Sequence, residues 1–298
     1  MSKSVLITGG TGLVGSALIP KLKAKGYNVS ILSRSQSMVE KTYIWDYKKE
    51  YLDPLAFEGV DTIVHLAGAG VADKKWTPER KDEIYNSRTK TSLLLQNELK
   101  KRDHQVKSFI AASAIGLYGS DTGNKIIKED APVGQDFLAH VTDAWDTSTR
   151  KIKELGLRLA QVRIGVVLSE KGGALKELLK PPVSAPLGKG DQYMSWIHID
   201  DLCDMIIYAI ENPEISGAYN AVGPKPFTNR DFTKVAAKVF KKPYLPIPVP
   251  SVILKLMLGE MSAIVLGGSR ISSEKIQKAG FQFSFPKLRE ALEDLKQR

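Results

Sequence analysis

A glycine-rich turn near the amino terminus constrains the fold of this chain more than any other feature of its sequence. An apolar run at residues 5–7 leads into the segment 8–15, and apolar residues then recur at helical spacing. A buried strand, a glycine turn and a helix start together form a phosphate-binding context. In such a turn Gly9 permits the tight bend, Gly12 lets a pyrophosphate approach the backbone, and Gly15 lets the helix pack closely. The sequence therefore predicts a dinucleotide site at Thr8, Gly9, Thr11, Gly12, Leu13, Val14 and Gly15.

Short apolar segments alternate with helical patterns over the first half of the chain. Apolar runs typical of strands buried on both faces occupy residues 5–7, 29–32, 62–64, 108–111 and 159–162. A helical repeat of apolar residues covers 13–22, 78–101 and 136–155. This alternation indicates βαβ units and a parallel sheet. We therefore expect a doubly wound α/β domain with a parallel sheet over residues 1–165.

The alternation weakens after residue 165. Prolines cluster at positions 181, 182 and 186 and again at 243, 246, 248 and 250, which is typical of irregular structure. Helical patterns return near 200–212, 228–240 and 286–296. We expect a small carboxy-terminal lobe over residues 166–298, from which 197–222 returns to the first domain.

Composition and charge exclude several classes of protein. The 298 residues are 43% hydrophobic and 26% charged, as in globular proteins, and the single cysteine excludes an intrachain disulfide. The net charge of +10 is interleaved with acidic residues, so a solvated basic surface is favoured over a nucleic-acid site. The four histidines are scattered and give no pair at metal-binding spacing, so we predict no metal site.

The most apolar stretch is 251–268. It contains Lys255 and Glu260, and each costs about 3 kcal/mol at the centre of a bilayer. We therefore expect a buried helix and not a membrane span. Because no apolar signal segment opens the sequence, we expect a cytoplasmic protein that acts on a small molecule and has neither a membrane nor a nucleic-acid partner.

The end of the second predicted strand indicates which dinucleotide binds. Folds that prefer NAD place an acidic residue there, which accepts hydrogen bonds from the ribose and would repel a 2′-phosphate. This sequence instead has Arg34, flanked by Ser33 and Ser35. A guanidinium group suits a phosphate, so the sequence predicts NADP(H) as the cofactor, with Ser33 and Arg34 at the 2′-phosphate.

Further motifs make the sequence resemble an extended short-chain dehydrogenase/reductase. They are the glycine spacing of 9–15, the run His65-Leu66-Ala67-Gly68, Ser113 with Tyr118-Gly119, and the run 196–201. A closer resemblance to the atypical branch called epimerase-family proteins rests on Ser87-Arg88 and on residues 163–168, 172–175, 196–201 and 280–283. The resemblance covers nearly the whole chain, and it implies an NADP-binding Rossmann domain with a small carboxy-terminal lobe.

The resemblance also implies which residues lie near the cofactor. They are Leu66, Ala67, Gly68, Glu83, Arg88 and Val167. Independently, small residues at the carboxyl end of a strand leave room for ribose or adenine at 66–68. Arg88 is alternatively an arginine packed against its own helix. Asp46 and Tyr47, at the end of the third strand, either edge the adenine or form a turn.

The residues that transfer protons in the wider superfamily are missing. There a Tyr-x-x-x-Lys pair acts on one helix face, and the lysine lowers the pKa of the tyrosine. No tyrosine in this sequence is followed by lysine four residues later. The segment where the pair belongs contains His140 and Asp143, which are most simply solvated helix residues.

Ser113 and Tyr118 remain as catalytic candidates. Ser113 would hydrogen-bond a substrate oxygen, and Tyr118 would donate a proton or serve only as a structural loop residue. Two hypotheses follow. The chain is an NADP(H)-dependent oxidoreductase or epimerase-like enzyme that acts on a small polar substrate, or it is an NADP(H)-binding regulatory or assembly protein without turnover.

Overall fold

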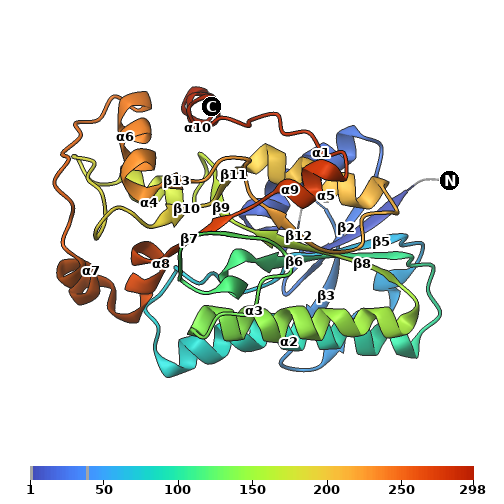
Figure 1. Ribbon diagram of the computed structural model, residues 1–298. Coiled ribbons are helices and arrows are strands. Elements are labelled where there is room, and N and C mark those ends of the chain that lie inside the picture. Colours follow the sequence, from blue (N-terminus) through green and yellow to red (C-terminus); the bar gives the residue numbers. More distant parts are fainter. Residues whose placement is uncertain (1–2, 38–39) are drawn as a thin grey trace.

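An eight-stranded sheet forms the centre of the molecule in the computed structural model, which describes residues 3–37 and 40–298 (Figure 1). Its strands are β1 (Ser4–Thr8), β2 (Asn28–Ser33), β3 (Lys41–Asp46), β4 (Tyr51–Leu52), β5 (Thr62–His65), β6 (Ser108–Ala114), β8 (Arg158–Ile164) and β12 (Gly217–Ala221). Their order is β12-β8-β6-β5-β1-β2-β3-β4, and only the pair β3–β4 is antiparallel. The predicted doubly wound α/β fold is thereby confirmed.

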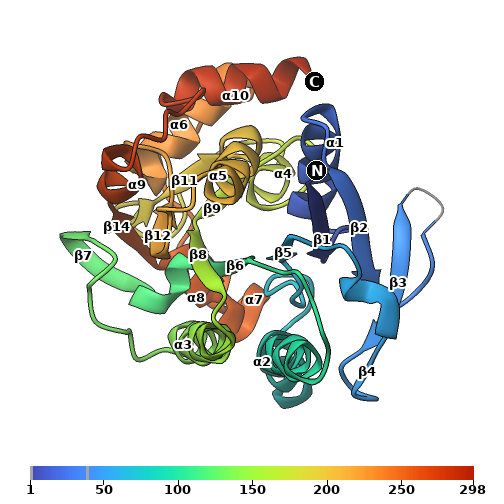
Figure 2. The same ribbon diagram turned by 90° about the vertical axis from the view of Figure 1, so that its right-hand side faces the viewer.

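Helices cover both faces of this sheet (Figure 2). On one face lie α1 (Leu13–Ala24) and α5 (Ile199–Glu211), and on the other lie α2 (Pro78–Lys101) and α3 (Phe137–Arg150). Side-chain caps fix where the second pair begins, since Thr77 accepts from the amide of Arg80 and Asp136 accepts from the amide of Ala139. The helices predicted at 78–101 and 136–155 begin at these caps, and the second consists of α3 and the 3-10 helix at 151–155.

Successive side chains of a strand point to opposite faces of the sheet, so the core is divided into two layers. Val5 and Ile7 of β1 belong to the same core cluster as Leu18 of α1, whereas Leu6 belongs to a second cluster with Leu95 of α2. A strand buried on both faces needs apolar residues at every position, and for this reason β1 appears in the sequence as a continuous apolar run.

Smaller elements form the rest of the chain. Three two-stranded sheets pair β9 (Val166–Leu168) with β11 (Trp196–His198), β10 (Tyr193–Met194) with β13 (Phe227–Thr228), and β7 (Asp121–Ile127) with β14 (Gly268–Ile271). The remaining α-helices are α4 (Ala174–Leu179), α6 (Asn229–Val239), α7 (Ser251–Leu258), α8 (Ser262–Leu266), α9 (Glu274–Lys278) and α10 (Leu288–Gln297). Short 3-10 helices are η1 (Pro54–Phe57), η2 (Ile115–Tyr118), η3 (Lys151–Leu155) and η4 (Gly259–Met261). Because β12 lies beside β8, the chain returns to the main sheet after leaving it.

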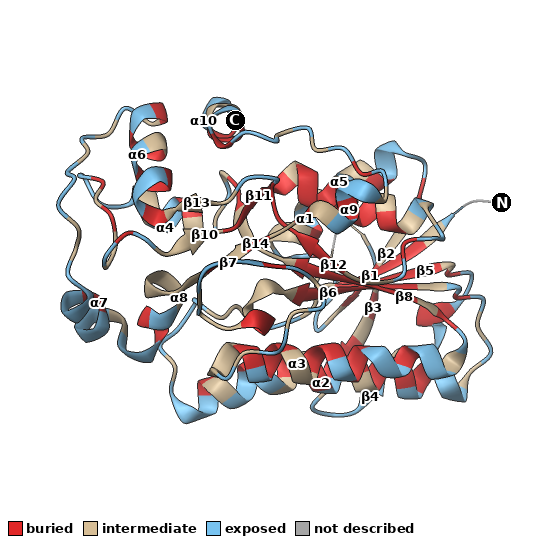
Figure 3. Ribbon diagram, in the orientation of Figure 1, coloured by how far each residue is buried: buried red, intermediate tan, exposed pale blue. Residues whose placement is uncertain are grey.

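The expectation of a buried helix over 251–268 was wrong. The segment forms α7, η4 and α8 in succession, and α7 is largely exposed, as Figure 3 shows in pale blue. Val252 is 74% and Leu256 is 84% exposed, whereas Leu254 is buried. Apolar composition alone does not determine whether another element packs over a helix. Among the described residues, no helix is both long enough and apolar enough to cross a membrane.

Candidate dinucleotide site

Three glycines shape the turn between β1 and α1, and the structure separates their roles. A Cβ on Gly9, whose φ is +70°, would lie 2.9 Å from the carbonyl carbon of Leu66. A Cβ on Gly15 would lie 2.4 Å from the carbonyl oxygen of Gly9 and 2.6 Å from Cα of Gly10. Both positions therefore exclude a side chain by contact with backbone. Gly12 differs, because its backbone is extended and its Cβ would meet only the oxygen of Gly9, at 3.3 Å.

The amino end of α1 presents free backbone donors. Gly12 is the N-cap of the helix and has no side chain with which to cap it. Within the described part of the chain, the amides of Leu13 and Val14 donate to no backbone carbonyl. Free amides at a helix start, together with the helix dipole, favour a bound phosphate. The open space at Gly12 and these donors fit the pyrophosphate of a dinucleotide.

A buried hydrogen-bond chain holds the ends of β1 and β5 together beneath the turn. The Thr8 hydroxyl accepts from the amides of Leu66 and Ala67, at 3.1 Å each, and lies 2.7 Å from Nδ1 of His65. Since that hydroxyl has one proton, it donates to Nδ1, and His65 donates from Nε2 to Ser92 Oγ at 3.0 Å. Burial lowers the pKa of His65 to about 3, so the ring stays neutral. Thr8 thus supports the predicted site from below.

Arg88 packs against the loop that follows β5. Its Nη1 donates to the carbonyls of Ala69, at 2.9 Å, and Ile84, at 3.0 Å. The guanidinium lies 5.1 Å from the ring centre of Trp145, and a Cβ on Gly68 would lie 3.1 Å from its Cζ. Burial lowers the pKa of Arg88 to about 10. These contacts are those of an arginine packed against its own helix, the second of the two interpretations of Arg88. They also fix the loop 66–69.

The residues predicted to surround the adenosine end lie on the surface. Arg34 is exposed at the end of β2, and no salt bridge involves it among residues 3–37 and 40–298. Its neighbour Ser33 accepts from the amide of Ser35 at 3.4 Å. Glu83 and Tyr47 line one surface hollow together, and the Arg80 guanidinium lowers the pKa of Glu83. Val167 lies apart from these residues, on β9 beside β11.

The two predicted catalytic residues belong to a buried polar network at the carboxyl ends of β6, β8 and β12. Ser113, Arg163 and Asn220 stand opposite one another in register across these three strands. Tyr118, in η2, donates to Asn220 Oδ1 at 2.7 Å and accepts from Arg163 Nη1 at 2.8 Å. Burial raises the pKa of Tyr118, although Arg163 opposes this shift. The geometry favours the structural interpretation of Tyr118 over proton donation.

Asp146 of α3 completes this network. Its Oδ2 lies 3.3 Å from both Nε and Nη2 of Arg163, and both side chains are buried. Burial raises the pKa of Asp146, while the facing Ser113 hydroxyl and Arg163 oppose the shift. Ser113 Oγ is buried and faces Asp146, but among the described residues it has no partner with full hydrogen-bond geometry.

Sequence reasoning missed Asp146, Arg163 and Asn220 as members of the network. A signal was present for Asp146, because it lies on the same helix face as the buried residues Thr142 and Thr149. A charged residue on a buried face needs a partner. By contrast, His140 and Asp143 of the same helix are not brought to the network. His140 is exposed, and Asp143 lies 3.9 Å from Arg150.

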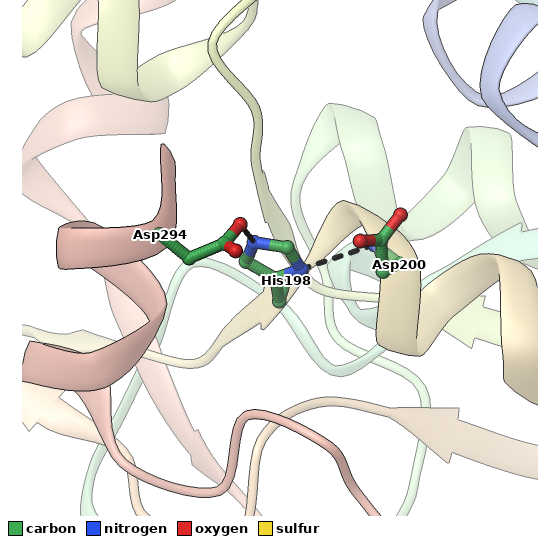
Figure 4. A group of neighbouring side chains, drawn as sticks. All are labelled: His198, Asp200 and Asp294. Carbon is green, nitrogen blue, oxygen red and sulfur yellow. Dashed lines mark hydrogen bonds and ion pairs between the residues drawn. The ribbon is translucent and has the colours of Figure 1, made fainter. Parts of the chain in front are cut away.

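His198 forms a second polar cluster with Asp200 and Asp294 (Figure 4). The Asp200 amide donates to its Nδ1 at 3.1 Å, so the neutral ring carries its proton on Nε2, which faces Asp294 at 3.2 Å. A metal ion would need a lone pair on Nε2, which this tautomer does not provide. Arg298 instead pairs with both carboxylates. The cluster therefore ties α10 to the start of α5, which is a structural role for His198.

Comparisons with known proteins agree with this architecture. A model of the "NAD dependent epimerase/dehydratase family" matches residues 5–139, and a "Domain of unknown function (DUF1731)" matches residues 249–295. Epimerase family protein SAR0825 of Staphylococcus aureus (strain MRSA252) is 35% identical to the chain, over 98% of this chain and 99% of that protein. Epimerase family protein YfhF of Bacillus subtilis (strain 168) is 34% identical, over 98% of this chain and 97% of that protein.

A solved structure is similar over the whole chain as well. The human epimerase family protein SDR39U1 (isoform 2), crystallised with NADPH, aligns with a TM-score of 0.88 at 28% identity, over 99% of each chain. The predicted resemblance to an epimerase-family short-chain dehydrogenase/reductase is confirmed by these similarities. The chain belongs to the NAD-dependent epimerase/dehydratase family, as do relatives named epimerase family proteins, and its residues 249–295 match DUF1731.

Proposed function

We propose that this protein binds NADP(H) in preference to NAD(H) at the carboxyl edge of its main sheet. The open backbone donors at Leu13 and Val14 would hold the pyrophosphate, and Arg34 with Ser33 would face the 2′-phosphate. The exposed Arg34 at the end of β2 is the observation that carries the preference, because an acidic residue there would repel that phosphate. The similar human protein that was crystallised with NADPH supports the same choice.

The bound cofactor would supply a hydride donor or acceptor to an oxidoreductase or epimerase-like enzyme that acts on a small polar molecule. In this reaction the chain itself orients the dinucleotide through the glycine turn and through the loop 66–69 that Arg88 fixes. Ser113 would turn its hydroxyl from Asp146 to donate a hydrogen bond to the substrate oxygen, because its Oγ makes no bond of full hydrogen-bond geometry within the network. Membership of the epimerase/dehydratase family supports this as the leading function.

A specific observation favours the second candidate, an NADP(H)-binding protein without turnover. The buried Tyr118 hydroxyl already donates a hydrogen bond to Asn220 and accepts one from Arg163. The sequence also contains no Tyr-x-x-x-Lys pair. General acid–base help is worth about 10²- to 10⁴-fold in rate, so an enzyme without it would be slow.

Two measurements test the proposal. Titration followed by nicotinamide fluorescence should give an NADPH affinity at least about tenfold higher than the NADH affinity, and equal affinities would refute the preference. Consumption of NADPH is then followed with a panel of carbonyls, sugar nucleotides and quinones. Turnover that Ser113→Ala lowers without a change in NADPH affinity supports the enzyme, whereas no turnover with any compound supports the binding protein.

A further inference from the structure

More than half of the exposed large apolar side chains lie in two segments that run beside each other. Twelve large hydrophobic side chains are exposed among the described residues, and seven of them lie in the segments 180–189 and 241–258. We call these seven the α7 surface: Val183, Leu245, Ile247, Val252, Ile253, Leu256 and Met257. Scattered exposed apolar residues are ordinary, but a cluster marks a contact surface.

Two backbone bridges hold these segments together. The amide of Leu245 donates to Ser184 and the amide of Val249 donates to Pro186, so 184–187 runs beside 244–249. The second segment then enters α7 directly, at the outer edge of the molecule (Figures 1 and 3). The α7 surface is therefore a supported part of the fold.

Helix α7 presents its apolar residues as two adjacent rows. Val252 and Leu256 are four residues apart, as are Ile253 and Met257, and such pairs are neighbours on a helix face. Leu254 is buried and attaches the helix to the lobe. Eight residues span about 12 Å, too short to cross a bilayer, but a helix of this length can lie in the interface with its apolar face inserted.

The charge on the two segments of the α7 surface is positive, although the exposed residues Asp191 and Glu260 follow these segments and Glu260 pairs with Lys81. The segments 180–189 and 241–258 contain Lys180, Lys189, Lys241, Lys242 and Lys255 and no acidic residue. Lys180 pairs with Glu177 outside these segments, and Lys242 donates to the carbonyls of Leu179 and Pro181. Lys189, Lys241 and Lys255 are exposed. A second copy of the chain would bring like charges together, whereas anionic headgroups would neutralise them.

We propose that the α7 surface docks the protein on the surface of an anionic lipid bilayer, with Val252, Ile253, Leu256 and Met257 inserted among the headgroups and the lysines against the phosphates. In this arrangement the protein is attached peripherally and does not span the membrane. This proposal departs from our sequence-based expectation of no membrane partner.

Co-sedimentation of the full chain with vesicles tests the proposal. Vesicles of phosphatidylcholine with about one-third phosphatidylglycerol should bind the protein at least about tenfold more tightly than phosphatidylcholine alone, and added salt should weaken this binding. Lys255→Gln should weaken it by up to about fivefold at low salt. Equal binding to both kinds of vesicle, or no binding to either, overturns the proposal.

Variants of the apolar rows provide the second arm. The double variant Val252→Ser/Leu256→Ser should lose at least about tenfold in vesicle binding, since both side chains leave the interface. Ile126→Ser is the matched control, because Ile126 is exposed on β7 outside the α7 surface, and it should bind as the wild type does. Unchanged NADPH affinity in the double variant checks its fold. If the wild type instead forms a dimer that the double variant abolishes, and binds no vesicle, a second copy covers the surface and the lipid proposal is wrong.

Discussion

The glycine turn offers a prediction that separates the needs of the fold from the needs of the ligand. In Gly15→Ala the new Cβ would lie 2.4 Å and 2.6 Å from backbone atoms of the turn, so backbone must move. Overpacking of this kind costs about 1–3 kcal/mol, and replacing glycine by alanine in a helix returns up to about 1 kcal/mol. Because neither contacted group is a flexible side chain, we expect a net loss of about 1–2 kcal/mol of unfolding free energy without ligand.

Gly12→Val should behave in the opposite way. The extended backbone at Gly12 accepts a branched side chain, and its Cβ would meet only one oxygen, at 3.3 Å. Loss of a glycine N-cap costs at most about 1 kcal/mol. The side chain would, however, occupy the space in front of the free amides, so NADPH binding should be abolished.

Urea unfolding with and without NADPH measures both effects. At a concentration of 100 Kd, NADPH should stabilise the wild type by about 2.7 kcal/mol and Gly12→Val not at all. Gly116→Ala serves as the control, because its Cβ would have neighbours no closer than 3.6 Å. If Gly12→Val is less stable than Gly15→Ala without ligand and is still stabilised by NADPH, the roles assigned to the two glycines are wrong.

Three further perturbations test other parts of the structure. Arg34→Asp should reverse the preference for NADPH over NADH by removing a contact worth about 1.5–3 kcal/mol, or roughly 10- to 100-fold in Kd; an unchanged ratio in fluorescence titration would place the 2′-phosphate elsewhere. Tyr118→Phe leaves Asn220 Oδ1 without its buried donor and should cost about 1–3 kcal/mol in urea unfolding, whereas Tyr85→Phe, at an exposed residue, should cost less than about 0.5 kcal/mol. The pKa of His65 falls from 6.5 to about 3 on folding, so its contribution to stability is full above pH 6.5 and is lost as the pH falls toward 3. Unfolding free energy should therefore drop by about 2 kcal/mol between pH 7.5 and pH 5 through His65 alone, and the same slope in His65→Gln would contradict this assignment.

Local signals explain why much of the fold was predictable from the sequence. Residues 9–15 contain four glycines, so the turn is recognisable from a short segment of sequence, although Gly9 also packs against the distant Leu66. The helix Pro78–Lys101 begins at a threonine cap followed by proline, so even its bounds agree with the helical pattern. Signals of this kind act within a few residues and do not depend on tertiary packing.

The catalytic candidates were harder to judge, because their surroundings are assembled from distant segments. Ser113 and Tyr118 have the types and order of a catalytic pair, but strand register places Arg163 beside Ser113, and α3 contributes Asp146. No short motif joins these positions. The exposure of α7 was unpredictable for a related reason, since burial depends on whether a distant segment covers the helix.

Residues Ser113, Arg163 and Asn220 form a polar row, and a substitution at one position of their network is expected to require a substitution at another. Each residue belongs to a different strand, and a slip of one residue in any of them would turn Arg163 or its partner toward the opposite face. Loss of Asp146 alone would leave the Arg163 guanidinium buried without its counter-charge, at a cost of about 3–5 kcal/mol. Relatives that replace Arg163 are therefore expected to have changed Asp146 as well, and those that replace Tyr118 by phenylalanine should differ at Asn220. The network would then be inherited or discarded as a unit, so sequences of this family should divide into two groups at these positions with few intermediates.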